Sequence, residues 1–158
     1  MTPTQLTGPV REMQWPIMLT LSGPLSRSCS VKAQRKLMRA FAKLRRTKAF
    51  GAVRGGIAAL EIKPSGKRFH LHIHAVVDAK WIDQNALEKA WSHTLDLKGV
   101  IHLERTRTPI AALNYSTKTE PVKIWDRHKL TCWGNVRNAW LAGNAVIRVR
   151  RLLRRGAL

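Results

Sequence analysis

Short stretches in which apolar residues dominate or alternate with polar ones predict four β-strands. They cover residues 16–22, about 57–63, 68–77 and 100–107. Gly23-Pro24 closes the first stretch, and Pro64-Ser65-Gly66-Lys67 forms a turn between the second and the third. Strands with such turn residues between them are typical of β-hairpins and short β-meanders. We therefore expect the second and third strands to pair as a hairpin.

Cap residues followed by amphipathic stretches predict three helices. They begin after Ser28 or Ser30, after Asp83, and at Pro109, and they run to about Lys48, Leu95 and Lys118. Ser and Asp accept hydrogen bonds from the first free N–H groups of a helix, and Pro is tolerated in its first turn. In the first helix Leu37, Met38, Phe41 and Leu44 form one apolar stripe.

The order β-α-β-β-α-β followed by a helix predicts an α+β fold of the split βαβ, or ferredoxin-like, class. We expect an antiparallel sheet with the two hairpin strands placed centrally and helices on one face, which leaves the other face open to a ligand. Residues 1–15 would be an N-terminal segment, 16–120 the main folded domain and 121–158 a basic C-terminal extension. Within that extension the stretch before Trp133 fits a hairpin or an ordered loop, and a helix is expected from about Asn135.

Charge changes the picture, because 29 Lys and Arg oppose 9 Asp and Glu, giving +20 at pH 7. No acidic residue lies between Glu12 and Glu61 or after Asp126. Two segments that carry only positive charges flank a central segment with charges of both signs. This pattern indicates a polyanion as binding partner, and we expect that partner to be nucleic acid. The candidate contacts are Lys32, Arg35, Lys36, Arg39, Lys43, Arg45, Arg46, Arg148, Arg150, Arg151, Arg154 and Arg155. Without a signal peptide, an apolar run of membrane-spanning length or a cysteine framework, we expect a cytoplasmic protein with no membrane partner.

Three histidines, His70, His72 and His74, alternate with apolar residues along the third strand. Alternate residues of a strand share a face, so the imidazoles point one way and the apolar side chains point into the core. Glu61 lies on the preceding strand of the hairpin. Two imidazoles and a carboxylate would suit Mn²⁺ or Mg²⁺ bound to phosphate oxygens. The alternatives are a polar sheet surface or one satisfied buried histidine and, for Glu61, a plain cross-strand partner of Lys or Arg.

Tyr115 is the only tyrosine, and Lys118 follows it by three residues on the predicted third helix. Residues three apart lie on the same side of a helix. A phenol is a poor nucleophile at neutral pH unless nearby positive charge stabilises the phenolate or the attacked phosphate. The pair could therefore form covalent bonds with phosphate, or Tyr115 could be a half-buried packing residue beside a solvated lysine.

From about Met18 to Glu120 the chain resembles the HUH endonucleases, specifically the rolling-circle replication initiators of small plasmids and phages. The matching segments are MLTLS, ALEIKPSGKRFHLHIHAVVD and AALNYSTKT. The resemblance implies a ferredoxin-like fold, His72 and His74 as metal ligands with Glu61 as the third, Tyr115 as nucleophile and Lys118 as its electrostatic helper. Many relatives have proline between the first two histidines, where this chain has Leu71. His70 could therefore be a further metal ligand or have an auxiliary role. Thr119 occupies the place of a second tyrosine, so one covalent DNA end could be carried at a time.

The activity that this resemblance implies is metal-dependent nicking and joining of single-stranded or hairpin origin DNA through a 5′-phosphotyrosine. A host polymerase would extend the released 3′-OH, and a host helicase would unwind the DNA. Three alternatives stay open: a single-tyrosine transposase of the same class, a histidine-triad nucleotide hydrolase with His72 as nucleophile, and a non-catalytic nucleic-acid-binding module. The origin sequence and the oligomeric state do not follow from the sequence.

Overall fold

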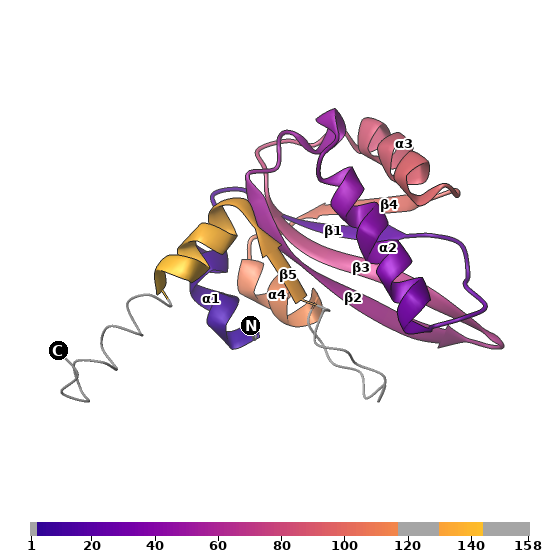
Figure 1. The fold of residues 1–158 in the computed structure, drawn as a ribbon. Coiled ribbons are helices and arrows are strands. Elements are labelled where there is room, and N and C mark those ends of the chain that lie inside the picture. Colours follow the sequence, from indigo (N-terminus) through magenta and orange to yellow (C-terminus); the bar gives the residue numbers. More distant parts are fainter. Residues whose placement is uncertain (1–2, 117–129, 144–158) are drawn as a thin grey trace.

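The computed structural model describes residues 3–116 and 130–143 and shows an α+β fold built on one five-stranded antiparallel sheet. The elements are α1 (Pro3–Arg11), β1 (Pro16–Ser22), α2 (Val31–Leu44), the 3₁₀ helix η1 (Lys48–Phe50), β2 (Gly55–Ser65), β3 (Arg68–Asp78), α3 (Gln84–Leu95), β4 (Val100–Arg105), α4 (Pro109–Ser116) and β5 (Leu130–Trp133). A further helix covers residues 134–143. Figure 1 shows the helices around the sheet.

The strand order β4-β1-β3-β2-β5 contains the split βαβ arrangement, with β5 added beside β2. The expected fold class is therefore confirmed. The expected place of the hairpin strands is only partly right: β3 is the centre of the sheet, whereas β2 is an inner strand because β5 pairs along its outer edge.

The expected caps begin the helices. Ser30 Oγ accepts a hydrogen bond from the N–H of Ala33, and Asp83 Oδ1 accepts one from the N–H of Ala86. The first helix ends earlier than expected, at Leu44 rather than near Lys48. Thr47 Oγ1 donates to the Leu44 carbonyl there, and the chain turns into η1.

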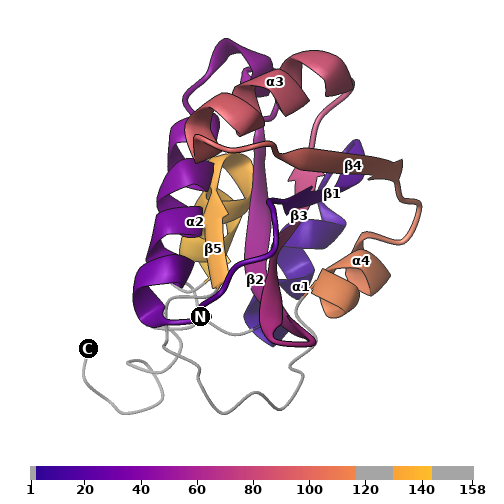
Figure 2. The ribbon, with the colours of Figure 1, turned by 90° about the vertical axis from the view of Figure 1, so that its right-hand side faces the viewer.

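Two hydrophobic clusters lie on opposite faces of the sheet. The larger one packs α2 and α3 against β1, β2 and β3 and includes Leu19, Phe41, Ile73 and Trp91. The smaller one joins α1 and α4 to the other face through Leu6, Val76 and Leu113, with Val136 from the helix over 134–143. Figure 2 shows α2 on one side of the sheet and α1 and α4 on the other. The face that we expected to be open is thus covered over part of its area.

A buried carboxylate fastens this cover to the sheet. Asp78 is fully buried at the end of β3, where its Oδ1 accepts a hydrogen bond from the N–H of Trp15 and its Oδ2 accepts one from Asn135 Nδ2. Arg54 Nε lies 3.9 Å from the same Oδ2. Buried charges are stable only when paired or hydrogen-bonded, so these contacts hold three separate segments at one end of the sheet.

Candidate functional site

The histidines of β3 lie on the face that carries α1 and α4. The hairpin register sets Glu61 directly opposite His72 and sets Thr20 of β1 opposite His74. Directly paired residues of antiparallel strands project to the same face. Glu61, Thr20, His72 and His74 therefore share one surface, as the sequence analysis expected for Glu61 and the imidazoles.

The three imidazoles form a stack along the strand. The ring centroids of His70 and His72 are 5.1 Å apart with an interplanar angle of 9°, and those of His72 and His74 are 6.0 Å apart with an angle of 12°. Exposure falls along the row: His70 and His72 are half-buried, and His74 is buried. The row thus runs from solvent toward the cover formed by α4.

His74 is held at both ring nitrogens. Its Nε2 lies 2.7 Å from Glu61 Oε2, and its Nδ1 lies 3.1 Å from Thr20 Oγ1. A carboxylate only accepts hydrogen bonds, so Nε2 carries the proton that is donated to Glu61. Lys63 Nζ lies 3.4 Å from the other oxygen of Glu61, so the basic partner of this carboxylate lies on its own strand rather than across the hairpin.

Burial and charge set the protonation of this group. Burial alone would raise the pKa of Glu61, but the hydrogen bond and charge of His74, together with the charge of Lys63, bring that pKa below its usual value of 4.5. Burial lowers the pKa of His72, and the positive charges of His74 and His70 lower it further. At neutral pH the site therefore offers a carboxylate and a neutral imidazole, which are the protonation states that bind metal ions.

Tyr115 meets this row from α4. Its ring centroid lies 5.5 Å from that of His74, with the rings edge to face, and the residue is 47% exposed. The packing of Leu113 and Ala112 against the sheet places the helix so that the phenol lies at the rim of the covered area. The fold thus brings Tyr115 next to His74, although the two residues are 41 positions apart in the sequence. Lys118, the expected partner of Tyr115, lies outside the described residues.

The donor set fits a divalent cation in part. Two neighbouring ligands of an octahedral Mg²⁺ at 2.1 Å lie about 3 Å from each other, close to the 2.7 Å between His74 Nε2 and Glu61 Oε2. A cation there would replace the shared proton. Within residues 3–116 and 130–143, no group of three or more His, Cys, Asp or Glu side chains is arranged to hold a metal ion as the side chains stand. The three-ligand site stays a prediction.

One histidine of this face was missed by the sequence analysis. His102 of β4 is paired with Thr20, which is itself paired with His74, so the three lie in one row across the sheet. His102 is exposed. The alternation in Val-Ile-His-Leu-Glu-Arg carried the signal, since Ile101 is buried and His102 and Glu104 are exposed.

The basic residues divide into two groups. Those of α2 and the turn after it are exposed, except for Arg45, which is half-buried. The Arg45 guanidinium lies 5.3 Å from the ring centroid of Phe41 and 4.8 Å from that of Trp133, and burial lowers its pKa. These contacts give Arg45 a packing role beside the nucleic-acid role expected for it. Arg148, Arg150, Arg151, Arg154 and Arg155 lie outside the described residues, as does Trp125.

Comparisons with known proteins add little. No protein-family model matches the chain, and no curated protein matches it. A solved structure described as the hypothetical protein ORF119 from Sulfolobus islandicus rod-shaped virus 1 is similar, with 17% identity and a TM-score of 0.42 over 77% of this chain and 97% of that one. In the part of the chain that the structure describes, none of the helices has the length and apolar character needed to span a membrane.

Proposed function

We propose that this protein is a single-strand DNA endonuclease and strand transferase in which Tyr115 is the nucleophile. One observation carries the proposal: the only tyrosine of the chain lies edge to face with His74, at 5.5 Å between centroids, beside the Glu61–His74 pair. The residue is 47% exposed, so part of it faces the solvent from which a large substrate would approach. A histidine-triad hydrolase or a plain binding module does not require a tyrosine at this place.

In the reaction, Tyr115 Oη attacks the scissile phosphorus in line. An O–P bond forms to the tyrosine, the P–O3′ bond breaks, the phenolic proton leaves to solvent or base, and the 3′ oxygen gains a proton. The products are a 5′-phosphotyrosine and a free 3′-OH. An incoming 3′-OH reverses the steps and rejoins the strand, and the energy of the phosphodiester is conserved in the tyrosyl bond.

Side chains of the protein would bind the cation, orient its ligands and stabilise charge on the reacting groups. Glu61 and His74 would supply the donors for Mn²⁺ or Mg²⁺, with His72 as the expected third ligand, and such a cation would polarise the scissile phosphate. Thr20 holds the His74 ring in place through Nδ1. Lys118 is expected from the sequence to stabilise charge on the phosphate or the phenolate. The biological role that agrees with the sequence resemblance is initiation of rolling-circle replication at a single-stranded or hairpin origin, with host helicase and polymerase.

The decisive experiment is incubation with labelled single-stranded DNA and Mn²⁺, followed by a denaturing gel and peptide mass spectrometry. We expect a covalent adduct on the peptide that contains Tyr115, lost with chelator and lost in Tyr115→Phe. Asn114→Ala, an exposed neighbour on α4, is the matched control and should keep the adduct. Undiminished strand cleavage by Tyr115→Phe would overturn the proposal, and hydrolysis of small nucleotides by that variant would favour the histidine-triad alternative.

A further inference from the structure

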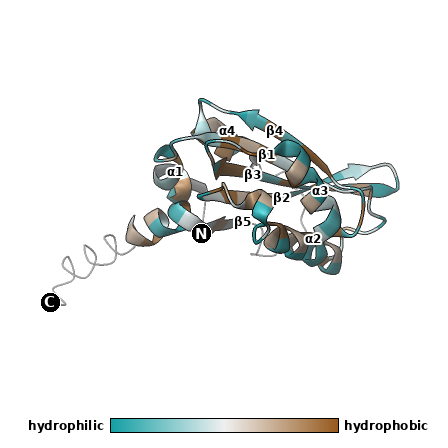
Figure 3. Ribbon diagram, turned by 90° about the horizontal axis from the view of Figure 1, so that it is seen from above, coloured by the Kyte–Doolittle hydropathy of each residue, from teal (hydrophilic) through white to brown (hydrophobic). Residues whose placement is uncertain are grey.

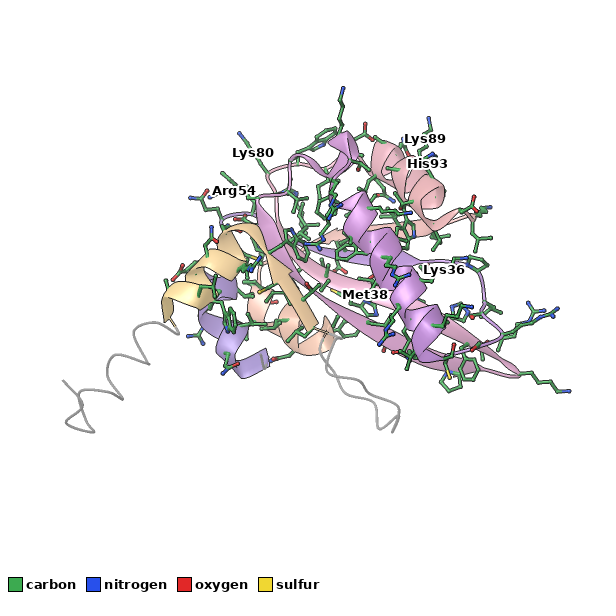
Figure 4. The ribbon with its side chains drawn as sticks, in the orientation of Figure 1. Lys36, Met38, Arg54, Lys80, Lys89 and His93 are labelled. Atoms are coloured by element: carbon green, nitrogen blue, oxygen red, sulfur yellow. The ribbon has the colours of Figure 1, made fainter. Side chains whose placement is uncertain are left out.

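A groove of about 710 Å³ lies between α2 and the C-terminal end of α3. It is on the sheet face opposite to Tyr115 and the histidines, because α2 and α3 pack on one face and α1 and α4 on the other (Figure 2). The proposed catalytic reaction makes no use of this side of the molecule. Figure 4 shows Lys36 on α2 and Lys89 and His93 on α3, the two helices concerned.

Four cations of α2 line this groove: Lys32, Lys36, Arg39 and Lys43. Their spacing of four, three and four residues places them in one stripe along the helix. All four are exposed, and none of them pairs with a carboxylate within the described ranges 3–116 and 130–143. Such a row of unneutralised charges repels itself and is stabilised by a polyanion.

Hydroxyl side chains of the groove add hydrogen-bond donors for phosphate oxygens. Ser28 and Ser30 add hydroxyls that accept backbone N–H hydrogen bonds, so their protons can be donated to phosphate oxygens. The Thr94 hydroxyl, in contrast, donates to the Trp91 carbonyl. Asp96 lies at the end of α3 and is the acidic member of the lining, so the phosphates would follow α2 rather than α3. Figure 3 shows that α2 carries hydrophilic as well as hydrophobic residues, consistent with one side packed on the sheet and one side free.

We propose that this groove binds the phosphate backbone of duplex DNA, as a second nucleic-acid site separate from the catalytic one. The stripe from Lys32 to Lys43 rises about 16 Å, and a duplex carries one phosphate charge per about 1.7 Å of its axis over such a length. None of the described lining residues is aromatic. Surfaces for unpaired strands combine cations with rings on which bases stack, so this lining favours a paired strand. The choice of DNA over other polyanions rests on the proposed function.

The test compares binding of a fluorescent 16-base-pair DNA duplex, in chelator and over a range of salt concentrations, by two variants of equal charge. The groove variant is Lys32→Gln, Lys36→Gln, Arg39→Gln, Lys43→Gln. The matched control replaces Lys48, Lys67, Lys80 and Lys89, which are also exposed, with Gln. Each phosphate contact contributes about 0.9 to the slope of log affinity against log salt concentration. We expect the groove variant to lose about 3 from that slope and at least about 30-fold in affinity, and the control to lose less than about 1.

Several outcomes would overturn the inference. Equal losses in the two variants would mean that only net charge matters. A single strand of the same length that is bound as tightly as the duplex, with the same loss in the groove variant, would contradict a duplex site. Stronger binding to anionic lipid vesicles would assign the groove to a membrane. Circular dichroism confirms folding of each variant, and Arg39→Glu alone should lower duplex affinity in the same direction. This test measures binding and not cleavage. The duplex site can therefore be disproved while the proposed nicking by Tyr115 is upheld, and nicking can be disproved while the duplex site is upheld.

Discussion

One face of β3 is packed beneath α2 and α3, whereas the other is open over its first half. Leu71, Ile73 and Ala75 belong to the larger core, and the residues between them, His72 and His74, belong to the candidate site. A shift of one residue along the strand therefore separates groups that stabilise the fold from groups that would carry out chemistry. Substitutions on the histidine face should mainly change DNA cleavage, and substitutions on the packed face should mainly change the free energy of unfolding.

The histidine face also differs along its own length. Beyond His74 the same face continues with Val76 and Asp78, both fully buried beneath α1, α4 and the helix over 134–143. Tyr115 lies at the boundary, on the helix that provides the cover. The site is thus located where the apolar cover ends, with a dry side that supports His74 and a wet side that admits a substrate.

The largest expected effect is on the open face. His72→Ala should lower metal-dependent nicking at least about 1000-fold, or about 4 kcal/mol in the barrier, because it removes an expected cation ligand. The free energy of unfolding should change by no more than about 1 kcal/mol, since His72 is half-buried. His93→Ala, an exposed histidine of α3, is the control and should cleave normally. Equal activity of the two variants would remove His72 from the site.

The next effect is on the packed face. Ile73 lies between His72 and His74 and is fully buried. Ile73→Ala should lower the free energy of unfolding by about 3 kcal/mol through lost burial and the cavity left behind. Urea denaturation measures this, and cleavage per folded molecule should be retained. A loss below about 1 kcal/mol would show that this face of β3 is not the main core.

A smaller effect should follow from the group that orients His74. Thr20→Val removes the hydrogen bond to His74 Nδ1, and loss of such a supporting contact typically lowers activity or metal affinity about 10–100-fold. We expect a shift in the Mn²⁺ concentration needed for half-maximal nicking, with Thr20→Ser restoring it. Thr47→Val removes a comparable hydroxyl contact, to the Leu44 carbonyl near the other face, and should leave that concentration unchanged.

The smallest effect is the pH dependence of stability in the metal-free protein. Because the pKa of Glu61 is lowered on folding, its contribution to stability is complete above about pH 4.5 and is lost as the pH falls through the folded pKa. The difference in unfolding free energy between the natural protein and Glu61→Gln should therefore shrink from pH 6 to pH 3. Glu104→Gln, which removes an exposed carboxylate of the same face, is the matched control variant. A gap for Glu61→Gln that widens in acid would contradict the described contacts.

Local signals account for most of what could be predicted. Ser30 and Asp83 cap helices through side-chain contacts that depend on nearby residues, and alternation along β3 fixed which histidines share a face. α1 was missed because it contains Gly8 and Pro9, which disfavour helix. Burial of Leu6 and Val10 against the sheet outweighs that preference.

Long-range contacts account for what was missed. β5 pairs with β2 across more than 70 residues, and Gly134, at φ +59°, lets the chain pass so close to Arg54 that a Cβ there would collide with its carbonyl. The joining of Tyr115 to His74, and of His102 to Thr20, likewise depends on register and helix placement that no local pattern encodes. The family resemblance predicted that Tyr115 and His74 belong to one site. The pairing of His102 with Thr20 became apparent only from the fold.

The strand order has a consequence for how the chain is made. β1 pairs with β3 and β4 but not with β2, the strand that follows it. At about 5–20 residues per second of synthesis, the ribosome needs roughly 3–10 s after Ser22 before β3 has emerged. During that time Leu19 and Leu21, fully buried in the finished sheet, have no partner strand. The first strand of the nascent chain therefore waits for its native neighbours longer than a strand that pairs with the next one in sequence.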